Sequence, residues 1–309
     1  MTREALDPTA ALRPRLPSPL QEVEDERFAR HGVRLVLKRD DLIHPALPGN
    51  KWRKLAPNLS AAAGRPVLTF GGAYSNHLRA TAAAGRLLGF PTIGVVRGDE
   101  LASRPLNPSL AQCRADGMAL VFVDRTTYRA KDDAQVRADL VRRAESEAAV
   151  SGEGIYVVPE GGSNALAARG CVALGHELHE VADVVGVACG TGGTLAGLAA
   201  GLAPGQRAIG FPVLKGGFLG EEIRRLQREA FGGPAGDWSL DERFHFGGYA
   251  RTTDELDAFA EDFEARHGLP VERLYVAKML YGLTELAGQG AFPSGAAVAA
   301  VVTGRPPSP

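Results

Sequence analysis

Short runs of apolar residues alternate along the chain with longer segments in which apolar and polar residues recur at helical spacing. The apolar runs have the length of buried strands and are mostly bounded by Gly, Pro or Asp. They cover residues 66–72, 92–99, 119–124, 155–162, 183–190 and 296–304. The helical segments cover residues 76–88, 131–149, 164–180, 194–202 and 254–267.

This alternation predicts an α/β protein with parallel or mostly parallel sheets flanked by helices. The 309 residues are enough for one large or two modest domains. Ligands of such sheets bind beyond the carboxyl ends of the strands, where turns into helices present N–H groups. Three of the predicted strands end in glycine-rich turns, at residues 71–72, 161–162 and 190–193. We therefore expect the functional residues to lie in those turns.

Composition and charge exclude several classes of function. Hydrophobic residues make up 45%, charged residues 23%, and the formal net charge is −1, which indicates a globular protein with no electrostatic preference for nucleic acid. No apolar run approaches the roughly 18 residues of a membrane span. The first 19 residues lack the apolar core of a secretory signal. Cys113, Cys171 and Cys189 are widely spaced and form no C-x-x-C pair, which favours reduced thiols and the cytoplasm.

Two lysines stand close together in the sequence LPGNKWRKLAPNL, residues 47–59. Lysine is scarce in this chain, with 6 lysines against 29 arginines. An ammonium can lose its proton and act as a nucleophile, whereas a guanidinium effectively cannot. Lys51 and Lys54 are therefore candidates for chemistry, although a solvated helix face would also explain them.

The sequence VVGVACGTGGTLAGLAAGL, residues 184–202, predicts a strand, a turn of small residues and a helix. It contains no P-loop, and the dinucleotide fingerprint fails because Leu195 stands at its third glycine. Backbone N–H groups of Gly190–Thr194 can converge on an anion at the helix start, and the hydroxyls of Thr191 and Thr194 suit a single phosphate. Close packing of helix on strand is the alternative explanation.

A second turn has the same architecture, with Gly71 and Gly72 followed by Ser75, Asn76 and His77. One polar residue would be enough to cap the helix that begins there. Three in succession indicate a site for a carboxylate. The sequence HELH at residues 176–179 lacks the spacing of H-E-x-x-H, so a polar helix face is favoured over a metal site.

Taken together, these segments resemble the fold-type II pyridoxal-phosphate enzymes, and most closely the D-cysteine desulfhydrase and 1-aminocyclopropane-1-carboxylate deaminase family. Similar segments follow in the same order from about residue 12 to 304. They are KRDDLIHPALPGNKWRKL (38–55), GGAYSNH (71–77), GTGGT (190–194), FHFGGYA (244–250) and ERLYVAKMLYGL (272–283).

The resemblance implies a two-lobed fold like that of the tryptophan synthase beta subunit. A larger cofactor-binding domain would comprise residues 1–49 and 158–309, and residues 50–157 would form a smaller inserted α/β domain. It further implies pyridoxal 5'-phosphate as cofactor, a small amino acid as substrate, and a homodimer. No nucleic acid, membrane or metal partner is expected.

The resemblance also assigns roles to residues that would hold the cofactor. Lys51 would form the Schiff base and later act as a base, and Lys54 would approach the phosphate. The remaining cofactor contacts would come from Asn76 on the 3-hydroxyl, from Gly190, Thr191, Gly192, Gly193 and Thr194 around the phosphate, and from Thr303 on the pyridine nitrogen. Ser75, Asn76 and His77 would meet the substrate carboxylate. Ser75, Tyr249 and Tyr275 would join Lys51 as catalytic residues.

Two positions depart from the family pattern. The deaminases carry an acidic residue directly after the second tyrosine, where this chain has Val276. The desulfhydrases end a C-terminal strand in His-Thr-Gly-Gly, and here the sequence is Val302-Thr303-Gly304-Arg305. Without an acid at the ring nitrogen the electron sink is weaker, which favours elimination of a good leaving group from the β-carbon.

The implied activity is therefore β-elimination from D-cysteine or another β-substituted alanine, giving a 2-oxo acid and ammonia. Opening of the cyclopropane ring remains an alternative, as does a biosynthetic carbon–sulfur lyase or β-replacement enzyme of the same family. Two alternatives come from other classes: a nicotinamide-dependent oxidoreductase, and a cofactor-storage or regulatory protein without turnover.

Overall fold

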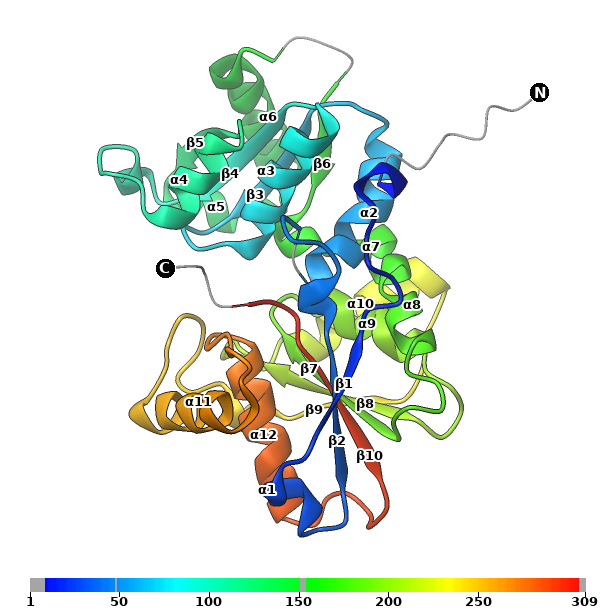
Figure 1. Ribbon diagram of the computed structural model, residues 1–309. Coiled ribbons are helices and arrows are strands. Elements are labelled where there is room, and N and C mark those ends of the chain that lie inside the picture. The colour runs from blue at the N-terminus through cyan, green and yellow to red at the C-terminus, as the bar shows by residue number, and fades with distance from the viewer. Residues whose placement is uncertain (1–8, 48, 151–153, 306–309) are drawn as a thin grey trace, which may run out of the picture. The chain divides into compact units, whose positions relative to one another are not determined.

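The computed structural model describes residues 9–47, 49–150 and 154–305 (Figure 1). These residues form two compact units. The smaller unit consists of described residues in the ranges 9–14 and 55–163, and the larger of those in 15–54 and 164–305. Helix α2 (Asn50–Ala62) begins in the larger unit, with Lys51 and Lys54, and ends in the smaller one.

The smaller unit contains, in its described part, a parallel four-stranded sheet in the order β5-β4-β3-β6. Its strands are β3 (Val67–Gly71), β4 (Thr92–Arg97), β5 (Ala119–Val123) and β6 (Tyr156–Val158). Its other helices are α3 (Asn76–Leu88), α4 (Pro108–Ala115), α5 (Arg125–Arg129) and α6 (Ala134–Ala148).

Helices cover both faces of this sheet because its strands are apolar on both faces. Val96 of β4 packs with Leu78 of α3 and Leu110 of α4. Ile93 and Val95 of the same strand belong to the cluster of α5 and α6 on the opposite face. Successive side chains of a strand point to opposite faces, so a strand buried on both sides is a continuous apolar run.

The larger unit contains, within the described ranges, a six-stranded sheet in the order β1-β2-β10-β7-β8-β9. Its strands are β1 (Leu20–Val23), β2 (Arg34–Lys38), β7 (Val184–Cys189), β8 (Arg207–Pro212), β9 (Trp238–Leu240) and β10 (Ala297–Val301). Its helices are α1 (Glu26–Ala29), α7 (Ala165–Gly170), α8 (Val172–His176), α9 (Gly193–Ala200), α10 (Leu219–Phe231), α11 (Asp254–His267) and α12 (Val276–Gly288). Edge strand β1 runs antiparallel to β2, and all other pairs are parallel.

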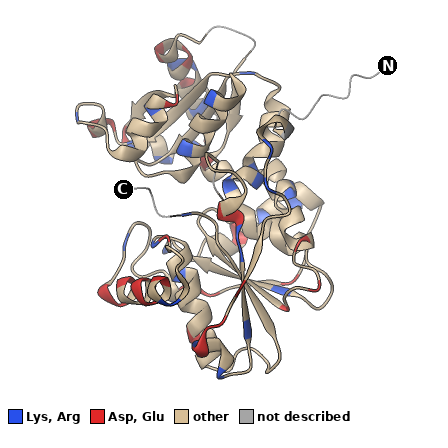
Figure 2. Cartoon of the chain, viewed as in Figure 1, with Lys and Arg blue, Asp and Glu red and all other residues tan. Residues whose placement is uncertain are grey.

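Two hydrophobic clusters bury the faces of this sheet. Apolar side chains of α1, α11 and α12 pack on one face, and those of α7 to α10 pack on the other. Helix α11 is rich in acidic residues, which appear as red segments of its ribbon in Figure 2. Because β7 and β10 lie at the centre of the sheet, the turns that follow them are supported on both sides.

The predicted fold class is confirmed, and each of the six apolar runs contains a strand. The predicted helix 164–180 is two short helices, α7 and α8, which meet at Cys171. Glycines at residues 170 and 175 weaken a continuous helix there. The predicted segments do not include strands β1, β2, β8 and β9 or helices α10 and α12.

A buried ionic cluster anchors the start of α2. The Arg53 guanidinium binds both carboxylate oxygens of Asp40 at 2.8 Å and those of Glu177 at 2.8 and 2.9 Å. The Lys38 ammonium lies 2.6 Å from the Glu177 carboxylate and also donates to the Ser18 carbonyl. Glu177 belongs to HELH, so this segment supplies an internal ion pair instead of a polar helix face.

The buried ionic cluster predicts that the stability of the fold decreases in acid. Burial raises the pKa of Glu177, but the hydrogen bonds and charges of Arg53 and Lys38 outweigh burial and lower it to about 2. Because the folded-state pKa lies below the unfolded value, Glu177 stabilises the fold above pH 4.5, and this contribution is lost as the pH falls toward 2. We expect Glu177→Gln to lower the unfolding free energy by about 3 kcal/mol at pH 6 and by much less near pH 2. Urea unfolding at several pH values measures this, with exposed Glu180→Gln as the control. Equal losses for Glu177→Gln at both pH values would contradict it.

Candidate active site

Both candidate lysines lie in the first turns of α2 within the larger unit. The Lys54 side chain is buried, and Lys51 is partly buried. Burial lowers the pKa of Lys51 to about 8. Burial and the positive charge of Lys51 lower the pKa of Lys54 to about 7. A sizeable fraction of each amine is therefore neutral near pH 7 to 8, as a nucleophile or base requires.

The glycine–threonine turn connects the end of β7 at Cys189 to the start of α9 at Gly193. Gly192 adopts a left-handed conformation with φ of +76°, and a Cβ there would lie 2.6 Å from the Cγ1 atom of Ile223. Only glycine fits this position without strain. The first N–H groups of α9 have no intrahelical acceptor and point out of the helix start, as an anion site requires.

Three contacts bring the lysines, the glycine–threonine turn and the end of β10 together. The Asn50 amide donates to the Thr194 hydroxyl at 2.8 Å, and the Lys54 ammonium lies 3.4 Å from the Thr191 hydroxyl. Gly49, with φ of +71°, packs so closely on the strand end that a Cβ would lie 1.6 Å from the Thr303 carbonyl oxygen. The Gly-Asn before Lys51 thus has a structural reason: glycine permits the approach, and asparagine connects to the turn.

Both tyrosines belong to the same part of the larger unit. The rings of Tyr249 and Tyr275 form an edge-to-face pair with centroids 6.1 Å apart. The Tyr275 ring also lies against Gly190, where a Cβ would be 3.4 Å from the ring and 3.5 Å from its hydroxyl oxygen. Tyr275 therefore stands beside the first residue of the glycine–threonine turn.

The structure also shows the surroundings of Val276 and Arg305, the two positions that depart from the family pattern. Val276 is fully buried as the first residue of α12 and offers no polar atom from its side chain. Arg305 forms an ion pair with the buried Asp41 carboxylate at 2.9 Å, and Asp41 also binds Arg39. The residue that replaces a family glycine therefore has a partner within its own unit.

Ser75, Asn76 and His77 lie in the smaller unit, at the start of α3. The Ser75 hydroxyl accepts from the Leu78 N–H at 3.2 Å and so caps the helix. The His77 ring is buried, with Nε2 2.7 Å from the Thr69 hydroxyl oxygen. The Asn76 side-chain oxygen accepts from Arg79. Ser75 and Asn76 are thus partly exposed at the start of α3, whereas the His77 ring lies in the interior of the smaller unit.

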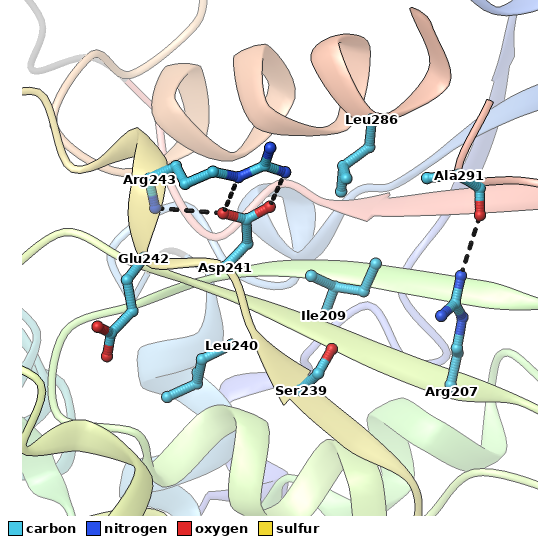
Figure 3. Close-up of a pocket in the computed structure, with 9 residues that line it drawn as sticks. All are labelled: Arg207, Ile209, Ser239, Leu240, Asp241, Glu242, Arg243, Leu286 and Ala291. Atoms are coloured by element: carbon cyan, nitrogen blue, oxygen red, sulfur yellow. Dashed lines mark hydrogen bonds and ion pairs between the residues drawn. The ribbon is translucent and has the colours of Figure 1, made fainter. Parts of the chain in front are cut away.

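A shallow pocket lies elsewhere on the larger unit, between β8, β9 and the end of α12 (Figure 3). Arg243 binds the Asp241 carboxylate there, and Arg207 reaches the Ala291 carbonyl. Arg207 pairs with Val184, the first residue of β7, whereas Gly190 follows the last residue of that strand. The pocket contains none of the predicted site residues.

Among the described residues, no helix is both long and apolar enough to span a bilayer. In the same part of the chain, no three His, Cys, Asp or Glu side chains are grouped so that they could hold a metal ion.

Comparison with known proteins settles the family. The model of the pyridoxal-phosphate dependent enzymes matches residues 13–304. The chain belongs to this family. It is therefore a pyridoxal-phosphate-dependent enzyme, and the resemblance drawn from the sequence is confirmed. The residues grouped around Lys51 fit such a cofactor, because they combine an amine of lowered pKa with a glycine-rich turn whose N–H groups open helix α9.

Several relatives and one solved structure are similar to most or about half of the chain. A Pyrococcus furiosus protein, provisionally named a 1-aminocyclopropane-1-carboxylate deaminase, is 31% identical over 84% of this chain and 81% of its own length. A D-cysteine desulfhydrase of Yersinia pestis is 36% identical over 55% of this chain and 53% of its own. The crystal structure of a homologue of the deaminase superposes with a TM-score of 0.77 at 27% identity, covering 98% of this chain and 95% of the other.

Proposed function

We propose that this enzyme performs β-elimination on a small amino acid, such as D-cysteine or another β-substituted alanine, to give a 2-oxo acid and ammonia. One observation carries the proposal: Lys51, with a pKa lowered to about 8, lies on a helix that contacts both the glycine–threonine turn and the end of β10. A base on α2 and an anion site in contact with the start of the same helix suit an α-amino acid bound through a phosphorylated cofactor.

The chain's own residues would hold pyridoxal 5'-phosphate at both ends. Lys51 would bind it covalently through its amine, and Thr303 would offer its hydroxyl to the pyridine nitrogen. Residues 190–194 would bind the phosphate through N–H groups at the start of α9, and the negative charge of the phosphate would favour the protonated form of the nearby Lys54. Asn76 would hydrogen-bond the 3-hydroxyl. When bound, the cofactor supplies an acceptor for the electrons released at the α-carbon.

Proton movement would rest on Lys51. Burial lowers its pKa to about 8, so its neutral amine can take a proton from the α-carbon near physiological pH. Tyr275 lies beside Gly190 with Tyr249 against its ring, which would place both hydroxyls near the reacting carbons. These hydroxyls would orient the substrate and exchange protons with the leaving group. Ser75, with the N–H groups at the start of α3, would bind the substrate carboxylate.

The buried Val276 favours elimination over opening of a cyclopropane ring. Ring opening starts without an α-proton, so it depends on a strong electron sink, which an acid at the ring nitrogen would provide. The Val276 side chain has no polar atom, and Thr303 is at most a neutral hydrogen-bond partner. Elimination can proceed with a weaker electron sink, because Lys51 can take the α-proton and a thiolate or chloride leaves readily.

We further propose a homodimer in the cytoplasm. Support for a reducing compartment comes from Cys113, Cys171 and Cys189, which are all buried as free thiols. Burial raises the pKa of the Cys171 thiol to about 11, so it is a poor nucleophile.

The proposed reaction predicts a specific order of substrates. Pyruvate should be released from D-cysteine or a β-chloroalanine at least about tenfold faster than 2-oxobutyrate from 1-aminocyclopropane-1-carboxylate. Parallel assays of 2-oxo acid release on a panel of L- and D-amino acids measure this, with Lys51→Ala as the blank. Faster ring opening than any elimination would replace the proposal by the deaminase alternative. Exchange of the β-substituent without 2-oxo acid release would favour β-replacement.

A further inference from the structure

Lys278 is a fully buried lysine for which the proposed reaction has no use. It lies on the first turn of α12, and its side chain is 0% exposed. Its ammonium donates to the carbonyl oxygens of His245 and Gly248, both at 2.9 Å. Burial lowers its pKa to about 8, although the negative charge of Glu272 opposes this shift. A buried cation is costly, so its retention needs a reason beyond filling space.

The segment that Lys278 contacts has an unfavourable backbone conformation. Phe246 and Ala250 have φ of +50° and +58°, and the two glycines between them, at 247 and 248, also have positive φ. A left-handed conformation is unfavourable for a residue with a side chain. The segment can hold this shape only if contacts compensate for that cost. Lys278 supplies two charge-assisted hydrogen bonds to its carbonyl groups.

The same end of α12 also fixes the second tyrosine. The Glu272 carboxylate accepts the backbone N–H groups of Leu274 and Tyr275 at 2.8 Å and that of Val276 at 3.3 Å. Glu272 therefore orients the backbone of Tyr275, while Lys278 holds the loop that carries Tyr249. The two rings meet edge to face, 6.1 Å apart.

We propose that Lys278 is a positioning residue that holds Tyr249 against Tyr275 by binding the His245 and Gly248 carbonyls. The assignment rests on the proposed function only in placing Tyr249 beside the reacting carbons. Lys278 touches neither substrate nor cofactor in this scheme. Its effect reaches the site through the conformation of residues 245–250.

The direct test observes Tyr249 without turnover. Fluorotyrosine is placed at position 249, and its ¹⁹F spectrum is recorded for the otherwise unchanged chain and for Lys278→Met, which keeps the volume but not the donors. We expect one sharp signal in the first and a shifted or broadened signal in the second. The control is Lys215→Met, because the exposed Lys215 lies beside Gly248 and should leave the signal unchanged. An unchanged signal in Lys278→Met would overturn the proposal.

A folding check and a kinetic test complete the design. The fluorescence of Trp52 and Trp238, both in the larger unit, reports whether the unit that contains Lys278 is intact. Lys278→Gln, whose amide keeps two N–H donors on a shorter side chain, replaces the methionine variant if that variant does not fold. We expect Lys278→Met to lower kcat by about 10- to 100-fold with little change in KM. In a Tyr249→Phe background the same substitution should add almost no further loss. Full additivity would show that Lys278 does not act through Tyr249. Absence of turnover in the unmodified enzyme would reject the proposed function, while the ¹⁹F result would still decide the role of Lys278.

Discussion

Replacing Lys51 by alanine should remove covalent cofactor binding and lower turnover by at least about a thousandfold. The amine would be both the attachment point of the cofactor and the base that takes the α-proton, and one such base alone contributes about 10²- to 10⁴-fold. The holoenzyme should show a visible absorption that is lost in the variant. Borohydride reduction followed by peptide mapping should find the pyridoxyl group at Lys51.

Two comparisons make this result specific. Lys51→Arg keeps the positive charge but cannot form a Schiff base, so it should be as inactive as the alanine variant. Lys215→Ala removes an exposed lysine and should retain full absorption and turnover. Pyridoxyl label at Lys54 or Lys38 would show that Lys51 is not the attachment site.

Substitution of Gly192 by aspartate should weaken pyridoxal phosphate binding by about 100-fold or more. The new carboxylate would stand in the turn that is proposed to bind the phosphate, and two like charges about 4 Å apart repel by about 4 kcal/mol at an effective dielectric constant of 20. Equilibrium titration followed by the cofactor's absorption measures the dissociation constant.

Backbone strain must be separated from charge in this experiment, because Gly192 has φ of +76° and its Cβ would meet Ile223. Gly205→Asp is the matched control. Gly205 has φ of +88°, yet a Cβ there meets no atom within 4 Å. The control should bind the cofactor normally. The cofactor affinity of Gly192→Ala should fall between those of Gly192→Asp and Gly205→Asp, since alanine adds the steric clash without the charge. Unchanged affinity in Gly192→Asp would reject the phosphate site.

The local sequence was sufficient to predict the strands and helix starts that depend on the residues within them. Apolar runs identified the strands that are buried on both faces, and the double glycine with Ser75 correctly marked the start of α3. Strands such as β1 and β9 were missed, since they lie at sheet edges and are not continuous apolar runs. The edges of a sheet are defined by neighbours that are distant in sequence.

The candidate site shows the same division. The lysine pair and the glycine–threonine turn were identified from residue types and spacing, and the two tyrosine segments from the family resemblance. The role of Asn50 was not, because its partner Thr194 is 144 residues away. Arg53 stands between the two lysines in the sequence and was not identified as a structural residue, yet it binds Asp40 and Glu177 in the interior of the unit.

By itself, the sequence determined the fold class and the family and supplied candidates for the chemistry, because these depend on local periodicity, on short segments in a fixed order and on the scarcity of lysine. Only the tertiary structure decided which of the six lysines are desolvated, that Gly49 packs on the Thr303 carbonyl, and that Lys278 and Glu272 support the two tyrosines. The physical reason is that a pKa shift, a close backbone contact and a buried hydrogen bond arise from groups brought together by folding. Their strength depends on solvent exclusion and distance, which no local pattern of residues encodes.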